Sequence, residues 1–280
     1  MNITIVIPLY KPDKKLLGKV LKKVKEQDFD GKTKIILIGN KGGLAEQLNW
    51  GIKKAKTEIV VTLQQDCVPV SKKWLKELIE PLKDKNIVAS SSKVELPYSL
   101  WKNFDWVAKL LTAKDQGILF PILDEKGSAY RKSILLKVGL FNSENFKTAG
   151  EDSDMILKLE DIGKIALTDA KIVHFHPTDW RKRFQKELQY ANGLGTLLRI
   201  HKFCRLDMFF GLIKSIPVIG WPVFLLRFPY KKVGKLGILW IPLSLILNFI
   251  YSVGFWRGFL SGKQKVYPDV NEYFRRYKSF

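Results

Sequence analysis

Cysteine and histidine are scarce in this sequence of 280 residues, which has two cysteines and three histidines. Cys67 and Cys204 are too few for a disulfide framework, and they do not have the spacing of a zinc site. A secretory signal is also missing, because the opening MNITIVIP has no basic start and no long apolar stretch before Pro8. We therefore expect a protein of a reducing compartment, with its N-terminal part in the cytosol.

Acidic residues are scarce in the last hundred positions. Residues 181–280 hold 18 Lys and Arg against 4 Asp and Glu, whereas residues 1–180 hold 30 against 23, and the whole chain carries a net charge of +21. Such an excess attracts phosphate, in nucleic acid or in anionic lipid headgroups. No zinc-finger, RNP-type or helix-turn-helix signature is present. We expect no nucleic-acid partner, and a basic nucleic-acid-binding protein remains the alternative from another functional class.

The first eighty residues alternate between short apolar strands and amphipathic helices. The predicted strands and helices follow in the order 2–8, 13–27, 34–38, 44–55, 58–63 and 71–82. Ser71 is the predicted N-cap of the last helix. This alternation is typical of a parallel, doubly wound α/β sheet, in which ligands bind beyond the carboxyl ends of the strands. The segments 9–13, 39–43 and 64–70 are therefore the first places to look for a site.

The patterns after residue 86 are weaker. They predict strands over 87–94, 164–166 and 171–175, and helices over 100–111, 133–140, 151–162 and 178–201. After Leu206 the composition changes. Residues 208–226 are apolar except for Lys214, and residues 236–256 carry no charge. We expect an α/β domain over residues 1–204 and an apolar, basic helical region over residues 205–280.

A helix over 236–256 would be about 31 Å long, close to the ~30 Å hydrocarbon core of a bilayer. Pro242 would kink it, and basic residues flank both apolar segments, so a hairpin or a single span would export positive charge. We expect helices that lie in the membrane plane or re-enter it on the cytoplasmic face, with Lys and Arg on anionic headgroups. The alternative is packing on the rest of the chain, or on a second copy in a homodimer.

Asp66 follows the predicted strand 58–63, in the sequence LQQDCVP. A carboxylate at the carboxyl end of a strand is well placed to hold a divalent cation. Mg²⁺ takes one or two protein carboxylates, and phosphates and waters complete its octahedron. A turn aspartate before Val-Pro is an equally weighted structural alternative.

Glu151 and Asp152 open the predicted helix 151–162. The helix dipole favours acidic residues in a first turn and keeps them ionised. Helix capping alone would explain them, since Asp154 lies in the same turn. The functional interpretation is that one of the pair is a general base, which must be deprotonated and face a cleft.

Two further groups of residues are candidates for ligand binding. His174 and His176 share one face of the predicted strand 171–175, where imidazoles could ligate metal or contact phosphate, although ordinary polar partners are the alternative. Gly42 and Gly43 precede a helix, and free backbone N–H groups there favour a phosphate or a polar nucleotide edge.

These segments together resemble glycosyltransferase family 2, which has the GT-A fold, over roughly residues 2–200. IVIPLYKPD resembles the first strand and the loop that binds the donor base. GGLAEQLNWGIKKAKTEIVVTLQQD resembles the stretch that leads to the DXD motif. The most specific segments are GSAYRKSILLKVGLFN and GEDSDMILKLEDIGKIALTDAKIVHFHP, which resemble the acceptor side with its ED pair and a later histidine.

The resemblance implies a GT-A domain over residues 1–204, Rossmann-like, with a mostly parallel sheet and flanking helices. It implies an inverting hexosyltransferase in which Asp152 is the catalytic base, beside Glu151, and Asp66 matches the last aspartate of DXD. The implied cofactor is Mg²⁺ or Mn²⁺, with Asp66, His174 and His176 as expected metal ligands. The expected donor-binding residues are Pro8, Tyr10, Asn40, Gly42, Gly43, Asn49, Gln65, Asp66 and Arg131.

Several positions differ from the family pattern. Gln64 stands where the family has the first aspartate, and the resulting Gln-Gln-Asp resembles a rhamnosyltransferase-type branch. The QxxRW motif of processive synthases is absent, which favours transfer of one sugar per encounter. The expected donor is a UDP-, GDP- or dTDP-sugar. The expected acceptor is a hydroxyl or phosphate of a cell-envelope glycan precursor or lipid-linked glycan. A nucleotidyltransferase and a catalytically weak family member that only binds nucleotide sugar are the alternatives.

Overall fold

The computed structural model describes residues 1–280 except 40–41, 120–122, 148, 176–178, 203–205 and 264–280. The chain divides by packing into two compact units. Unit 1 comprises Met1–Tyr98, Gly117–Ser143 and Glu151–His176. Unit 2 comprises Ser99–Gln116, Glu144–Gly150 and Pro177–Phe280. This division assigns residues 177–204 to unit 2, so the functional boundary predicted after residue 204 stays a prediction.

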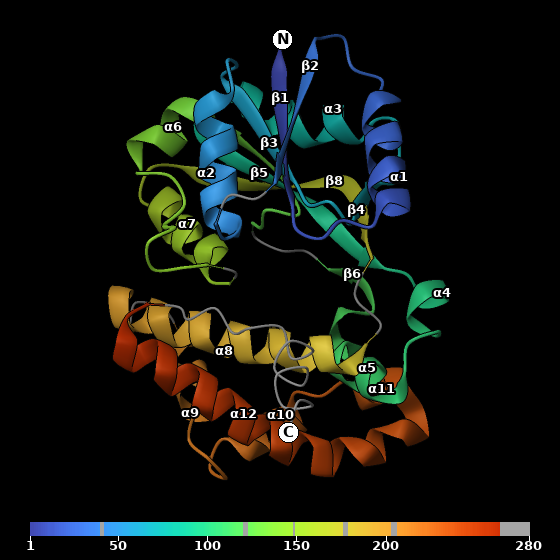
Figure 1. Ribbon diagram of the computed structural model, residues 1–280, viewed down its shortest axis with the longest axis vertical. Coiled ribbons are helices and arrows are strands. Elements are labelled where there is room, and N and C mark those ends of the chain that lie inside the picture. The colour runs from blue at the N-terminus through green and yellow to red at the C-terminus, as the bar shows by residue number, and fades with distance from the viewer. Residues whose placement is uncertain (40–41, 120–122, 148, 176–178, 203–205, 264–280) are drawn as a thin grey trace, which may run out of the picture. The chain divides into compact units, whose positions relative to one another are not determined.

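Unit 1 is built on a curled sheet, whose described residues form eight strands (Figure 1). They are β1 Ile3–Leu9, β2 Thr33–Gly39, β3 Ile59–Leu63, β4 Cys67–Pro69, β5 Ile87–Leu96, β6 Gly117–Leu119, β7 Gly127–Arg131 and β8 Lys164–His174. The order is β2-β1-β3-β7-β5-β8-β4, with β6 paired to β5. Strands β1, β2, β3, β5 and β8 run in one direction, and β4, β6 and β7 run in the other. The predicted α/β class with a mostly parallel sheet is confirmed.

Helices cover both faces of this sheet, because successive strand residues point to opposite sides. The helices of unit 1 are α1 Lys14–Lys25, α2 Leu44–Lys54, α3 Trp74–Ile79 with the 3-10 helix η1 Glu80–Lys83, α6 Lys132–Lys137 and α7 Glu151–Glu160. Ile3, Ile5 and Ile7 of β1 pack with α1 and α3. Val6 of β1 and Val60 of β3 pack with α2, α6 and α7. Two apolar layers therefore hold the carboxyl ends of β1 and β3 in place.

The sequence predictions for three segments differ from the structure in where a helix begins or in how many elements form. The helix predicted from Ser71 begins at Trp74, because the Ser71 hydroxyl accepts from the backbone N–H of Lys73 in a turn before the helix. The helix predicted over 100–111 is two helices, α4 Tyr98–Trp101 and α5 Trp106–Leu111, and Asp105 caps the second. The two short strands predicted over 164–175 form one strand, β8.

Unit 2 is helical. Besides α5 and most of α4, it contains α8 Trp180–His201, α9 Leu206–Lys214, α10 Trp221–Leu226, α11 Tyr230–Val233, α12 Trp240–Ser261 and the 3-10 helices η2 Ala113–Asp115 and η3 Gly234–Leu239. Helices α8 and α12 touch through their backbones. A Cβ atom on Gly195 of α8 would overlap a carbonyl oxygen of α12, and one on Gly258 of α12 would overlap a carbonyl oxygen of α8. The Asn192 amide also donates to the Gly254 carbonyl, at 3.1 Å.

Among the described residues, one helical segment of unit 2, Tyr230–Ser261, is long and apolar enough to cross a membrane by length and composition. A buried helix of a soluble protein meets the same test, and 44% of the most apolar window is buried here. Large apolar side chains are nevertheless exposed on and beside this segment: Leu226, Ile238, Leu239, Ile241, Ile246, Phe249, Val253 and Leu260.

Candidate active site

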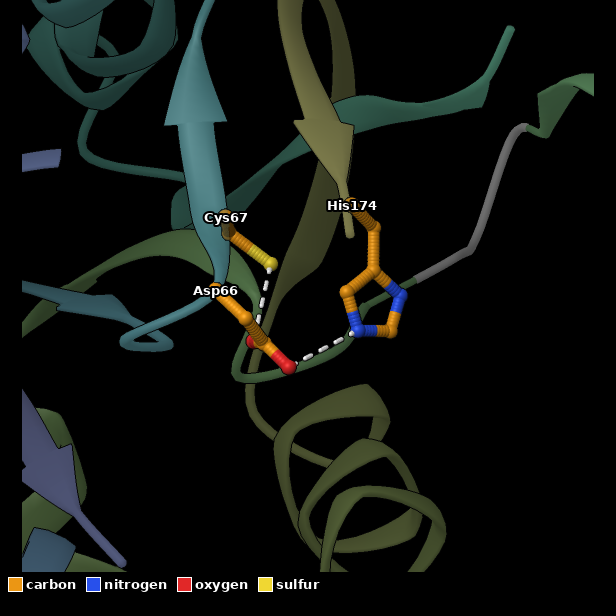
Figure 2. Close-up of side chains that lie close together, drawn as sticks. All are labelled: Asp66, Cys67 and His174. Atoms are coloured by element: carbon orange, nitrogen blue, oxygen red, sulfur yellow. Dashed lines mark hydrogen bonds and ion pairs between the residues drawn. The ribbon is translucent and has the colours of Figure 1, made fainter. Parts of the chain in front are cut away.

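Asp66, Cys67 and His174 lie together at one end of the β4–β8 pair (Figure 2). The antiparallel register pairs Cys67 with His174, and the backbone N–H of Phe175 donates to the Asp66 carbonyl at 2.9 Å. Asp66 Oδ2 lies 3.5 Å from His174 Nε2, and Cys67 Sγ lies 3.8 Å from Asp66 Oδ1. The sheet therefore brings together two of the three predicted metal ligands. His176, the third, lies outside the described residues.

The chemistry of this cluster fits a divalent cation. One carboxylate oxygen, one imidazole nitrogen and one thiol sulfur all lie within 4.8 Å of one another. Burial raises the pKa of the Cys67 thiol well above its usual value, and the Asp66 charge raises it further, so the sulfur keeps its proton. Since metals bind the thiolate form, the available donors are the oxygen of Asp66 and the nitrogen of His174.

Gln64 is bound to a buried carboxylate that the sequence patterns did not single out. Its Nε2 donates to Glu125 Oε1 at 2.6 Å. Glu125 is 6% exposed and lies just before β7, whose Gly127 pairs with Leu63 at the end of β3. The residue that replaces the first aspartate of the DXD pattern therefore donates to a carboxylate, which an aspartate could do only when protonated.

Glu125 belongs to an acidic group in the interior of unit 1. Burial raises the pKa of Glu125 to about 7, and the nearby negative charge of Asp152 adds to this effect. Asp124 is also buried, but Lys126 neutralises it through a 3.0 Å ion pair. Glu125 Oε2 is buried without a hydrogen-bond partner, and the raised pKa keeps this carboxyl mainly protonated below about pH 7.

The neighbours Glu151 and Asp152 have different environments. Glu151 is 2% exposed, and burial followed by the charges of Glu125 and Asp152 raises its pKa well above the usual value. Asp152 is half-buried, and its Oδ1 accepts from the backbone N–H of Ser153 at 2.7 Å. Burial raises the pKa of Asp152, whereas Lys126 and the Ser153 N–H oppose the rise. Asp152 is therefore the more accessible member of the pair, and Lys126 and the Ser153 N–H partly offset the cost of its charge.

The loop after β1 is joined to the turn after β3. Gln65 accepts from the backbone N–H of Tyr10 at 2.9 Å and donates to the Tyr10 carbonyl at 2.8 Å. Pro8 is buried at the end of β1, and the Tyr10 side chain is 69% exposed. The structure thus brings Tyr10, Gln65 and Asp66 to one edge of the sheet. The Gln65 amide is already engaged with the backbone, which makes it a support for the Tyr10 loop.

The other predicted donor-binding residues have varied positions. Gly43 is the N-cap of α2, and Gly42 before it has a φ of +50°, so both lie at a helix N-terminus as expected. Asn40 lies outside the described residues. The Asn49 amide is occupied by the backbone of Phe141, through bonds of 2.7 and 2.9 Å. Its role in donor binding stays a prediction.

Arg131 is not brought to this edge of the sheet. It pairs with Ile59 at the start of β3, whereas Asp66 follows the end of that strand. Its guanidinium donates to the backbone carbonyls of Ile87, Leu82 and Asp84. The structure thus gives Arg131 a supporting contact with the segment after α3.

Glu125 and its neighbours are the functional candidates that the sequence patterns missed. The signal was present in the sequence LDEKG, where three successive charged residues stand directly before the buried strand Gly127–Arg131. Charged residues at the end of a buried strand lie at the edge of the sheet, where a site is expected. No regular apolar spacing marks this segment.

Comparison with known proteins bears on the enzyme class and the fold of this chain. The model of the family described as Glycosyl transferase family 2 matches residues 17–139. This is less than half of the chain, and it covers β2, β3, Asp66 and β7. The match confirms the predicted enzyme class, a glycosyltransferase, for the segment that carries Gln64, Asp66 and Glu125. The rhamnosyltransferase-type branch is not indicated by the match.

Among solved structures, the mannosyltransferase PcManGT from Pyrobaculum calidifontis, in complex with GDP-Man and Mn²⁺, has a TM-score of 0.60 and 16% identity. The similarity covers 91% of this chain and 86% of that one. The structure of S. aureus TarS 1-349 has a TM-score of 0.45 and 16% identity, over 92% of each chain. No curated protein matches this chain. The first similarity confirms the predicted GT-A fold.

Proposed function

We propose that this protein transfers a single sugar from a UDP-, GDP- or dTDP-sugar to a hydroxyl or phosphate acceptor, with inversion at the anomeric carbon. One observation carries the proposal. Gln64, two residues before Asp66 of the Asp66–His174 pair, donates to Glu125, and the charge of the half-buried Asp152 acts on Glu125. A cation-binding pair and a carboxylate base are the two elements that this reaction needs.

Asp66 and His174 are the proposed ligands of a divalent cation, Mn²⁺ or Mg²⁺. Such an ion would neutralise the donor diphosphate and stabilise it as a leaving group. The mixed oxygen and nitrogen donor set favours Mn²⁺, since Mg²⁺ prefers oxygen ligands alone. The presence of GDP-Man and Mn²⁺ in the mannosyltransferase structure agrees with this choice.

Asp152 is the proposed catalytic base. It would take a proton from the acceptor hydroxyl, and the oxygen would then attack the anomeric carbon as the bond to the diphosphate breaks. Glu151 is less suited to this role than Asp152, because Glu151 is buried and holds its proton more tightly. Keeping Glu151 and Glu125 protonated leaves the negative charge of this region on Asp152.

The donor site is proposed to include the Tyr10 loop and the helix N-terminus at Gly42 and Gly43. The exposed Tyr10 ring offers a surface for a nucleotide base, and Gln65 holds that loop in position. Free N–H groups at the start of α2 suit a phosphate or a polar base edge. The proposed roles of Pro8, Asn40, Asn49 and Arg131 rest on the family resemblance alone.

The proposed location is the cytoplasmic face of a membrane, with a lipid-linked or cell-envelope glycan as acceptor. The exposed apolar side chains of unit 2 and the basic C-terminal third support this location. A homodimer that covers the same apolar surface is the competing arrangement. Sedimentation of the full chain with anionic vesicles, compared with its oligomeric state in solution, distinguishes the two.

The Asp152→Asn variant tests the proposed function. General-base catalysis contributes about 10²- to 10⁴-fold, so we expect release of nucleoside diphosphate from nucleotide sugar with Mn²⁺ to fall by that factor. Binding of the nucleoside diphosphate, measured by calorimetry, should be unchanged. Asp161→Asn, an exposed carboxyl of the same unit, is the matched control. Near wild-type turnover in Asp152→Asn would exclude this base, and no turnover in the wild type with any nucleotide sugar would favour a binding-only protein.

A further inference from the structure

Unit 2 contains an open cavity of about 120 Å³ that the proposed reaction does not use. A single water needs roughly 10–15 Å³ measured in this way, so the cavity has room for a larger group. Its walls are apolar and include Leu111, Val223, Phe224 and Trp240. Four charged side chains also line it: Lys114, Glu187, Lys214 and Arg227.

The charges of the cavity do not balance. Three cations face one carboxylate, which leaves a net charge of +2. Glu187 and, to a smaller extent, Asp115 raise the pKa of Lys114. Burial and then the positive charge of Lys114 lower the pKa of Lys214 to about 8; Arg227 adds to this fall, and Glu187 opposes it only in part. An anion in the cavity would relieve this repulsion.

Aromatic rings hold two of the cations in place. The Lys214 ammonium lies 4.4 Å from the ring centres of both Phe224 and Tyr251. The Arg227 guanidinium lies 4.3 Å from the ring centre of Phe210. Such cation–π contacts fix the position of a charge without neutralising it. The cavity is thus a preformed positive site inside an apolar wall.

Exposed apolar side chains adjoin the lining residues in the sequence. Leu226, 85% exposed, precedes Arg227, and Leu239 and Ile241, also exposed, flank Trp240. A small inorganic anion would make no use of these side chains. An anion attached to hydrocarbon chains would use both the charges and the apolar surface.

We propose that this cavity binds the phosphate monoester headgroup of a membrane lipid, whose chains lie along the exposed apolar side chains of α10, η3 and α12. A phosphate monoester carries a charge of about −1.5 to −2 at neutral pH, which matches the net +2 of the cavity. A phosphodiester headgroup carries a single negative charge and matches it less well. This proposal does not depend on the proposed sugar transfer.

The test compares vesicles of phosphatidylcholine that contain phosphatidic acid, a monoester, with vesicles that contain phosphatidylglycerol, a diester, at equal surface charge. We expect the full-length wild type to bind the monoester vesicles about tenfold more tightly, because charge-assisted hydrogen bonds are worth about that factor each. The double variant Lys114→Gln/Lys214→Gln should lose this preference. The control Lys182→Gln/Lys235→Gln removes two exposed lysines of unit 2 that do not line the cavity, and it should keep the preference.

Equal binding of the two vesicle types by the wild type, or a preference that survives in Lys114→Gln/Lys214→Gln, would overturn the inference. A further experiment measures the melting temperature with inorganic phosphate alone. If phosphate raised the melting temperature in a Lys214-dependent way while vesicles added no affinity, the ligand would be a free phosphate and the lipid assignment would be wrong. If Lys114→Gln/Lys214→Gln were poorly folded, as judged by its melting temperature, Arg227→Gln would replace it with the same expected loss.

Hydrolysis of nucleotide sugar with Mn²⁺ separates this inference from the proposed function. The variant Lys114→Gln/Lys214→Gln should keep the hydrolysis rate of the wild type while it loses the lipid preference. A wild type that prefers monoester vesicles but cleaves no nucleotide sugar would contradict the proposed function alone. A wild type that cleaves nucleotide sugar without lipid preference would contradict the cavity assignment alone.

Discussion

The substitution Glu125→Gln removes a titration from the interior of unit 1 and keeps a side chain of the same shape beside Gln64. Burial raises the pKa of Glu125 from 4.5 to about 7 in the folded chain. Between these pH values the folded state binds more protons than the unfolded state. The stability of the wild type therefore falls as the pH rises through this window.

The size of the effect follows from the shift. One pKa unit corresponds to 1.36 kcal/mol, so a shift from 4.5 to about 7 makes this group cost roughly 3 kcal/mol of stability above pH 7. Glu125→Gln should escape that loss. Between pH 5 and pH 8, the free energy of unfolding of the wild type should fall more than that of Glu125→Gln. The difference between the two falls should be roughly 3 kcal/mol. Since the charge of Glu125 also raises the pKa of Glu151, part of the gain comes from that neighbour.

Urea unfolding followed by circular dichroism at pH 5, 6, 7 and 8 measures this difference. Asp161→Asn removes one exposed carboxyl from the same unit and is the matched control. We expect the control to follow the wild-type dependence on pH, and Glu125→Gln to diverge from it progressively between pH 5 and pH 7 and to run nearly parallel to it above pH 7. Parallel curves for the wild type and Glu125→Gln would refute the buried, proton-holding carboxyl on which the assignment of the base depends.

Three further predictions follow from the geometry. Gln64→Asp would place a carboxylate next to Glu125 in place of a 2.6 Å hydrogen bond. The melting temperature should therefore drop more at pH 8, where both carboxyls are charged, than at pH 5. An equal drop at the two pH values would contradict repulsion between like charges as the cause. Asp66→Asn should weaken Mn²⁺ binding, measured by calorimetry with nucleoside diphosphate present, at least tenfold, and unchanged metal affinity would remove Asp66 from the ligands. Gly195→Ala should destabilise unit 2 by about 1–3 kcal/mol through overpacking, measured in thermal melts. The control is Gly18→Ala in α1, whose new Cβ meets nothing within 4 Å; this variant should be neutral or stabilising.

The sheet of unit 1 could be predicted from the sequence because its strands are short, β-branched and separated by amphipathic helices. The strands β1, β2 and β3 match the predicted segments to within a residue or two. Local hydrogen bonds account for the boundaries that differ. Asp105 caps a second helix and thereby divides the predicted one, an effect that apolar spacing does not reveal.

The site was only partly predictable. The sequence predicts roles for Asp66 and Asp152 from their positions after a strand and at the start of a helix together with the family resemblance, and these roles stay predictions. Glu125 was not found, since its importance comes from the Gln64 contact, which joins residues 61 positions apart. The occupied amides of Gln65 and Asn49 were equally hidden, because a sequence does not tell whether a polar side chain is already bound to backbone.

The backbone contact between α8 and α12 limits how the chain can meet a bilayer. In α8 the uncharged stretch that accompanies α12 lies between Glu187 and Arg199, about 18 Å of helix against a hydrocarbon thickness of ~30 Å. If α12 crossed the bilayer while still in contact with α8, it would draw these charges into the lipid. Crossing would otherwise require the two helices to separate and to break the Asn192–Gly254 bond. Because the glycines bring the two helix backbones into contact, a chain that keeps this contact could meet a bilayer only from one side. The small residues of α8 and α12 would then limit the topology as much as hydropathy does.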